Sequence, residues 1–142
     1  MTRSLNCIIL AAGQGTRMRS NTPKVMHDIA GRPMLHHVIA TAQTLAPDAI
    51  ITVLGPAMEA VQTTIEGTDR AIQQERLGTG HAVQCALAQT DMANSDVLIL
   101  YGDVPLITSA TLQRLLAIYR DGDHAAALLA MTPDDPAGYG RI

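Results

Sequence analysis

The sequence predicts an α/β fold, a Rossmann-like parallel sheet with helices on both faces. Short apolar runs alternate with segments whose apolar residues recur at helical spacing, which is typical of a parallel sheet built from strand–helix units. Glycine-bearing loops follow two of the expected strands, at residues 13–15 and 78–80. Residues 97–100, Val-Leu-Ile-Leu, are apolar at every position, which predicts a central strand buried on both faces.

Each expected element rests on a local signal. Strands are expected where apolar and β-branched residues run together, at residues 5–10, 49–54, 70–73 and 97–100. Helices are expected where apolar residues recur at helical spacing, at residues 33–46, 57–66 and 81–92 and in a segment carrying Leu112, Leu115, Leu116 and Tyr119. Pro33 suits the first turn of its helix, and Thr108 can cap the last one. Residues 125–131 fit a strand or, given their alanine content, a helix.

Composition limits the classes of function. The chain has 142 residues, 47% of them hydrophobic, which is enough for a core in one domain or most of one. Phe and Trp are absent, which argues against aromatic platforms for single-stranded nucleic acid. The two cysteines, Cys7 and Cys85, lack zinc-site spacing and are expected to be free thiols. Without an apolar run of membrane-spanning length or a signal peptide, a cytoplasmic protein with no membrane partner is expected.

Charge is distributed unevenly along the chain. The net charge of −3 gives no reason to expect a nucleic-acid partner. Within residues 1–32, however, basic residues outnumber the single acid, Asp28; they are Arg3, Arg17, Arg19, Lys24 and Arg32. The remainder is acidic overall. A basic start on an acidic chain favours a small anionic ligand over a long polyanion.

The loop after the first strand has the composition of a phosphate-binding turn. Ala11, Ala12 and Gly13 let the backbone approach a bound group, and exposed backbone N–H groups can surround an anion. Arg17 adds a donor fork that suits phosphate oxygens. No Walker A pattern is present, and Met18 stands where the dinucleotide fingerprint needs its third glycine. A dehydrogenase is therefore the least favoured function. A plain strand-to-helix turn that binds no ligand is the alternative interpretation of this loop.

Two further residues indicate a triphosphate and a metal. Lys24, the only lysine, follows the loop and can place a point charge on phosphate. Asp103 follows the strand at 97–100, and its carboxylate is expected at the same edge of the sheet, where it can hold Mg²⁺. A solvated lysine and an Asx turn are the alternatives for these two positions. His81 is expected to have a structural or hydrogen-bonding role rather than an acid–base role.

Several segments resemble a known family. The run from Leu10 to Met18, with the following Pro23-Lys24, resembles the signature of sugar-phosphate nucleotidyltransferases that use nucleoside triphosphates. Three further segments resemble one branch of it, the uridylyltransferase domain of the bacterial bifunctional UDP-N-acetylglucosamine pyrophosphorylase / glucosamine-1-phosphate acetyltransferase family. These segments are residues 73–82 (QQERLGTGHA), 100–106 (LYGDVPL) and 138–142 (GYGRI). The resemblance runs from about residue 6 to the last residue.

The resemblance implies transfer of UMP from UTP to N-acetylglucosamine-1-phosphate, with Mg²⁺ as cofactor. Arg17 and Lys24 would hold phosphates and stabilise charge in the transition state, and Asp103 would bind Mg²⁺. Gln73 would read the uracil edge. The full set of implied substrate contacts is Leu10, Ala11, Ala12, Gly13, Lys24, Gln73, Gly78, Thr79, Tyr101, Gly102, Asp103 and Gly140.

The chain also departs from that family. Position 14 is Gln where many relatives carry Lys. Residues 1–142 are expected to be the nucleotide-binding part of a single nucleotidyltransferase domain, without the family's later sugar-binding residues, its second Mg²⁺ ligand or its acetyltransferase part. A nucleotide-binding or regulatory module without full catalysis therefore stays open, as does a molybdenum-cofactor guanylyl- or cytidylyltransferase. The resemblance leaves room for a homo-oligomer in a full-length form.

Overall fold

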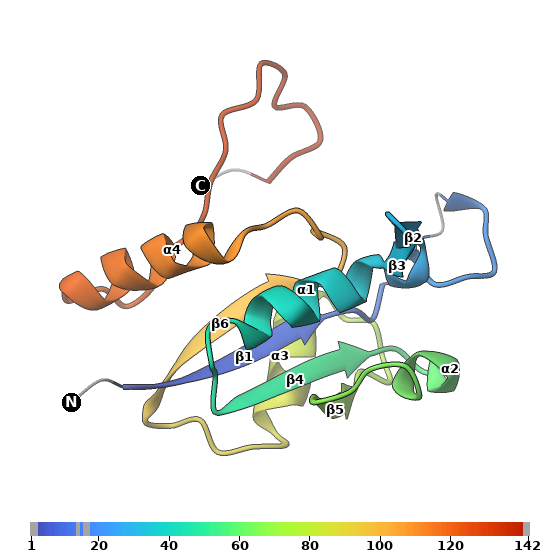
Figure 1. The fold of residues 1–142 in the computed structure, drawn as a ribbon, viewed down its shortest axis with the longest axis horizontal. Coiled ribbons are helices and arrows are strands. Elements are labelled where there is room, and N and C mark those ends of the chain that lie inside the picture. Colours follow the sequence, from blue (N-terminus) through green and yellow to red (C-terminus); the bar gives the residue numbers. More distant parts are fainter. Residues whose placement is uncertain (1–2, 14, 16–17, 141–142) are drawn as a thin grey trace. The chain divides into compact units, whose positions relative to one another are not determined.

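The computed structural model describes residues 3–13, 15 and 18–140 (Figure 1). Arg17 and Gln14 lie outside these residues. The chain divides into two compact units, Met1–Ser109 and Ala110–Ile142, and each is considered by itself. The expected site residues lie in the first unit, with Gly140 as the exception.

The first unit is built on a four-stranded parallel sheet of order β5-β4-β1-β6. Its strands are β1 (Ser4–Leu10), β4 (Ala49–Leu54), β5 (Asp69–Ile72) and β6 (Ser95–Tyr101). All four strands expected from the apolar runs are present, and the α/β class is confirmed. Because the strands are parallel, their carboxyl ends meet at one edge of the sheet, where ligands of open α/β sheets bind.

Helices cover both faces of this sheet (Figure 1). Helix α1 (Met34–Gln43) lies on one face, and α3 (Thr79–Leu87) lies on the other against β1, β4 and β5. Successive side chains of a strand point to opposite faces, so each strand serves both layers. The residues packed on the α3 side are aliphatic, Ala or Met: Ile8, Ala12, Ile51, Val53, Ala71, Ala82, Ala86 and Met92.

The helix boundaries differ from the expected ones at several ends. Pro33 is the N-cap residue of α1 and does not lie within its first turn. Helix α2 (Glu59–Gln62) is a single turn within the longer segment expected there. Helix α3 begins two residues earlier than expected and ends at Leu87, before Thr90 and Asp91, residues that favour turns over helix interiors.

The small elements between β1 and α1 were not expected from the sequence. They are a 3₁₀ turn, η2 (Lys24–Met26), and a hairpin of β2 (Asp28–Ile29) and β3 (Arg32–Pro33). The two turn residues of the hairpin both have positive φ, 52° at Ala30 and 75° at Gly31, as a type I′ turn requires. Strands of two residues are too short to give an alternating pattern, so the hairpin leaves no periodic signal.

The expectation that β6 is a central strand buried on both faces is wrong for the described sheet. β6 is its last strand, and burial alternates along it: Leu98 and Leu100 are buried, whereas Val97 and Ile99 are 37% and 43% exposed. The exposed residues pair in register with Asn6 and Ile8 of β1. A continuous apolar run does not distinguish a strand buried on both faces from one buried on a single face. Here α3 packs mainly against β1, β4 and β5, and β6 keeps one exposed face.

The second unit contains helix α4 (Ser109–Asp121) apart from its first residue, and a helix was expected there. Residues 125–131 form neither of the two elements considered for them. Leu128 and Leu129 are 71% and 59% exposed, and a strand needs a pairing partner, which no described residue provides. Among the described residues, no helix has the length and apolar character needed to span a membrane.

Candidate nucleotide site

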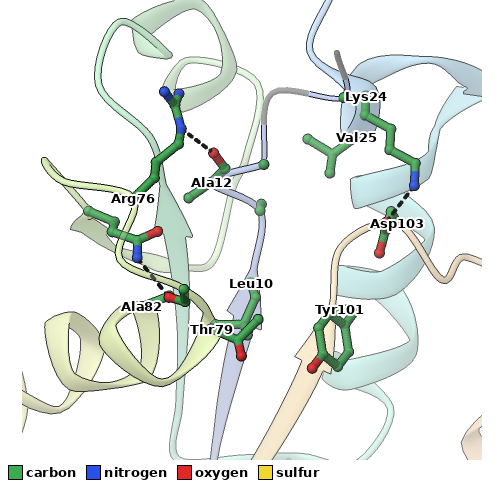
Figure 2. Close-up of a pocket in the computed structure, with 14 residues that line it drawn as sticks. Leu10, Ala12, Lys24, Val25, Arg76, Thr79, Ala82, Tyr101 and Asp103 are labelled. Atoms are coloured by element: carbon green, nitrogen blue, oxygen red, sulfur yellow. Dashed lines mark hydrogen bonds and ion pairs between the residues drawn. The ribbon is translucent and has the colours of Figure 1, made fainter. Parts of the chain in front are cut away.

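A pocket of about 280 Å³ lies at the carboxyl edge of the sheet in the first unit. It is formed by the ends of β1 and β6, the loop after β5, the start of α3 and the η2 turn (Figure 2). Most of the substrate contacts implied by the family resemblance line it: Leu10, Ala11, Ala12, Gly13, Lys24, Gln73, Gly78, Thr79, Tyr101 and Asp103. The sheet therefore gathers residues that are far apart in the sequence.

Backbone hydrogen bonds fix the loops where they leave the strands. The amide of Ala11 donates to the carbonyl of Val53 over 2.9 Å, and that of Gly102 donates to Leu10 over 2.9 Å. Gly102 does not line the pocket. A Cβ on it would lie 3.2 Å from both the Leu10 carbonyl oxygen and Leu35 Cδ1. Its missing side chain lets the end of β6 close against β1, and this packing carries the chain to Asp103.

Lys24 and Asp103 meet in an ion pair on one side of the pocket (Figure 2). Lys24 Nζ donates to Asp103 Oδ2 over 2.7 Å, and the side chains are 41% and 32% exposed. The expected convergence of the two residues on one rim is thus observed. Gly15, with φ 62°, lies directly against Lys24. A side chain at this position would not fit, since its Cβ would lie 2.5 Å from Lys24 Cβ.

Asp103 suits a metal ion that is shared with a substrate. Among the described residues, no group of three or more His, Cys, Asp or Glu side chains could enclose a metal ion. Mg²⁺ is usually held by one or two carboxylates together with waters and substrate phosphates. Asp103 supplies one such carboxylate, whereas a site closed entirely by protein is not found among the described residues.

Gln73 lies on the other side of the pocket and is held by its amide. The residue is only 4% exposed. Its Nε2 donates to the carbonyl of Gly78 over 2.9 Å and lies 3.2 Å from Nδ1 of His81. The hydrogen-bonding role expected for His81 is observed in this contact. The bond to Gly78 also ties Gln73 to the glycine loop that begins α3.

Sequence reasoning gave no role to Arg76, which also lines the pocket. Its Nε donates to the carbonyl of Ala12 over 3.1 Å, on the side opposite the Lys24–Asp103 pair (Figure 2). Arg76 lies inside the family-like segment 73–82, but nothing in that segment shows that its side chain reaches back to the first loop. The other lining residues absent from the expected contacts are Gly15, Val25 and Ala82. The apolar side chains of Val25 and Ala82 are typical of core packing, so the sequence gives no signal for them.

Besides Gly102, two expected site residues are not placed in the pocket. Arg17 lies outside the described residues. Gly140 belongs to the unit Ala110–Ile142, and its approach to a sugar stays a prediction. The charged residues among the described pocket lining are Lys24, Arg76 and Asp103, so two cations face one carboxylate in a pocket suited to an anion.

Relatives resemble this chain over nearly its whole length. It is 52% identical over 139 residues to the bifunctional protein GlmU of Paramagnetospirillum magneticum and 55% identical over 141 residues to that of Stutzerimonas stutzeri. These alignments cover 97% and 98% of the chain but only 31% and 30% of the relatives. The chain therefore spans less than a third of the length of these relatives.

Solved structures agree on the fold. Rv0371c from Mycobacterium tuberculosis superimposes with a TM-score of 0.70 at 27% identity, over 83% of this chain and 62% of that one. Its complex with manganese gives 0.67 at 25% identity, over 82% and 59%. A 4-diphosphocytidyl-2C-methyl-D-erythritol synthase from Anaerococcus prevotii gives 0.65 at 19% identity, over 83% and 52%, a likeness of fold alone.

The family model for MobA-like NTP transferase domains matches residues 7–139. This range contains both glycine loops, the Lys24–Asp103 pair and every strand of the sheet except the first residues of β1. With the pocket at the expected edge of the sheet, the sequence match and the fold agree, and the chain belongs to the MobA-like NTP transferase family.

Proposed function

We propose that the chain is the nucleotide-binding part of an enzyme that transfers UMP from UTP to N-acetylglucosamine-1-phosphate and releases pyrophosphate. The observation that carries the proposal is the pocket itself, in which a glycine loop, the Lys24–Asp103 pair and Gln73 share one sheet edge. The chain is 52% and 55% identical to two proteins named GlmU over 97% and 98% of its own length, which supports this choice of substrates.

The proposed reaction needs no nucleophile from the protein. A phosphate oxygen of the sugar phosphate attacks the α-phosphorus of UTP, and the bond to pyrophosphate breaks. Lys24 would align the triphosphate and offset its charge, and the backbone from Ala11 to Gly13 would bound it on the other side. Arg76, through Ala12, would hold that backbone in place.

A divalent metal fits this proposal through Asp103, whose carboxylate would hold it beside the phosphates. The chemistry that the ion supplies is neutralisation of phosphate charge. Support for divalent metal use comes from Rv0371c, which has been solved as a manganese complex. The choice of Mg²⁺ rests on the abundance of oxygen ligands in such a site, with one carboxylate and several phosphates.

A second candidate is a guanylyl- or cytidylyltransferase for a molybdenum cofactor, which the MobA-like family match favours. The two candidates differ in the base that they bind. A third candidate, a nucleotide-binding module that does not turn over, follows from the fact that the chain spans 30–31% of the length of its GlmU relatives.

Two measurements on the chain separate the three candidates. Calorimetric titration with UTP, GTP and CTP in the presence of Mg²⁺ identifies the base, and preference for UTP is expected. Pyrophosphate release from UTP and N-acetylglucosamine-1-phosphate then separates turnover from binding alone. A preference for GTP or CTP would reject the proposed substrate, and UTP binding without pyrophosphate release would leave the binding module.

A further inference from the structure

The Gln73 amide is oriented by acceptors on its nitrogen side. A primary amide nitrogen has two hydrogens, and the two acceptors beside Nε2 are the Gly78 carbonyl at 2.9 Å and His81 Nδ1 at 3.2 Å. The backbone of Gln73 is fixed too, because its N–H donates to the Leu54 carbonyl over 2.8 Å. With both hydrogens engaged, the atom that the amide has left for a ligand is Oε1, an acceptor.

His81 is suited to act as an acceptor toward Gln73. A neutral imidazole carries its proton on one nitrogen and accepts on the other. If Nδ1 accepts from Gln73, the proton resides on Nε2, which lies 3.8 Å from the sulfur of Cys85, a weak acceptor. The surroundings of both ring nitrogens are therefore consistent with one tautomer.

We propose that His81 determines base specificity indirectly, by holding the Gln73 amide with Oε1 toward the base in the pocket. Uracil presents an N–H at ring position 3, which such an acceptor can bind. Cytosine presents a lone pair at the same position, and two acceptors facing each other leave both unpaired at a desolvated site. This inference rests on the proposed function, since it concerns the base of the nucleotide bound there.

The discriminating measurement is the ratio of the CTP to the UTP dissociation constant. CTP is the matched competitor because cytosine has the size of uracil and differs in its hydrogen-bonding edge. Titrations with Mg²⁺ present would compare the wild-type chain with His81→Leu and His81→Asn. The leucine variant leaves the amide only the Gly78 carbonyl, so the ratio is expected to fall roughly threefold to tenfold, the worth of one hydrogen bond.

The asparagine variant is the conservative rescue. Its side-chain oxygen can take the position of His81 Nδ1 and accept from Gln73, so a ratio close to that of the wild type is expected. Gln84→Leu, an exposed position on the same helix that does not line the pocket, is the matched control and should leave the ratio unchanged. Circular dichroism with thermal unfolding verifies folding, and His81→Ala replaces the leucine variant if that variant does not fold.

Several results would overturn the inference. A leucine variant that weakens UTP and CTP equally, or neither, shows that His81 is a packing residue. Loss of the preference in the asparagine variant as well has the same meaning. A wild-type chain that binds UTP without preference over CTP rejects the inference and leaves a nucleotide-binding site, whereas a chain that binds neither nucleotide rejects the proposed function with it.

Discussion

Lys24 forms an ion pair with the Asp103 carboxylate, the group that a metal ion would need. The two side chains of the Lys24–Asp103 pair are 41% and 32% exposed, and ion pairs in such surroundings contribute about 0–1 kcal/mol. The pair is therefore weak enough for a divalent ion and a triphosphate to separate it, with the ion taking Asp103 and the phosphates taking Lys24. Without a nucleotide, the ammonium group and the ion compete for the same oxygen.

Removing that competitor is expected to increase metal affinity. The Lys24→Met variant without nucleotide should bind Mn²⁺ roughly twofold to fivefold more tightly than the wild type. This factor corresponds to the free energy that an exposed ion pair contributes. Electron paramagnetic resonance of free Mn²⁺ measures this directly. Arg32→Met removes one exposed positive charge away from the pocket lining and should have little effect. Equal or weaker Mn²⁺ binding in Lys24→Met would contradict competition at Asp103.

Cys7 is expected to be chemically inert in the folded chain. It is fully buried in β1, and burial raises the pKa of its thiol from 9.0 to about 12. Because folding favours the neutral thiol, this contribution to stability is intact below pH 9 and is lost as pH rises from 9 toward 12. At pH 8 a disulfide reagent should modify the half-buried Cys85 first and Cys7 only after unfolding.

Mass spectrometry of the labelled peptides distinguishes the two cysteines. Modification of Cys7 in the native chain at the rate seen in denaturant would show that β1 is not held in the sheet as described. The free energy of unfolding should also decline between pH 9 and pH 12, and Cys7→Ala should remove the part of that decline that comes from thiol ionisation.

At the scale of elements, the first loop depends on Gly15. Its φ of 62° is unfavourable for other residues by about 1–2 kcal/mol, and a Cβ would lie 2.5 Å from Lys24 Cβ. Gly15→Ala is therefore expected to lower the free energy of unfolding by about 1–2 kcal/mol and to displace Lys24, which weakens UTP binding. Urea denaturation and calorimetry give the two quantities.

Gly13→Ala is the matched control for stability. A Cβ on Gly13 has no atom within 4 Å, and no positive φ is found there. Its unfolding midpoint should therefore equal that of the wild type. If the two alanine variants unfold at the same urea concentration, the close approach of the loop to Lys24 is not a constraint on the fold.

Elements with strong periodicity could be predicted from sequence, and elements defined by tertiary context could not. The run before the first glycine loop and the helix carrying Leu112 have patterns long enough to identify. The two-residue strands around Ala30 have none, and they exist because the turn brings them together. The exposed leucines after α4 show the converse: an apolar run becomes a strand only where a partner strand is present.

At the scale of the whole molecule, sheet topology explains why part of the site could be predicted. Lys24 and Asp103 are 79 positions apart, but the parallel pairing of β1 with β6 brings the segments after both strands to one edge. Predicting this proximity needs only the rule that open α/β sheets bind ligands at the carboxyl ends of their strands. The roles of Arg76 and His81 depend on side-chain direction across the pocket, which no pattern in the sequence specifies.

The pocket also carries a reporter of its own occupancy. The chain has no Trp and three Tyr, and one of these, Tyr101, lies in the pocket lining with 50% of its surface exposed. A nucleotide that occupies the pocket changes the surroundings of this ring, so the ultraviolet fluorescence of the unmodified protein should follow UTP titration. Tyr101→Leu should abolish the signal change and Tyr139→Leu should retain it; an unaltered response in Tyr101→Leu would place the emitting ring elsewhere.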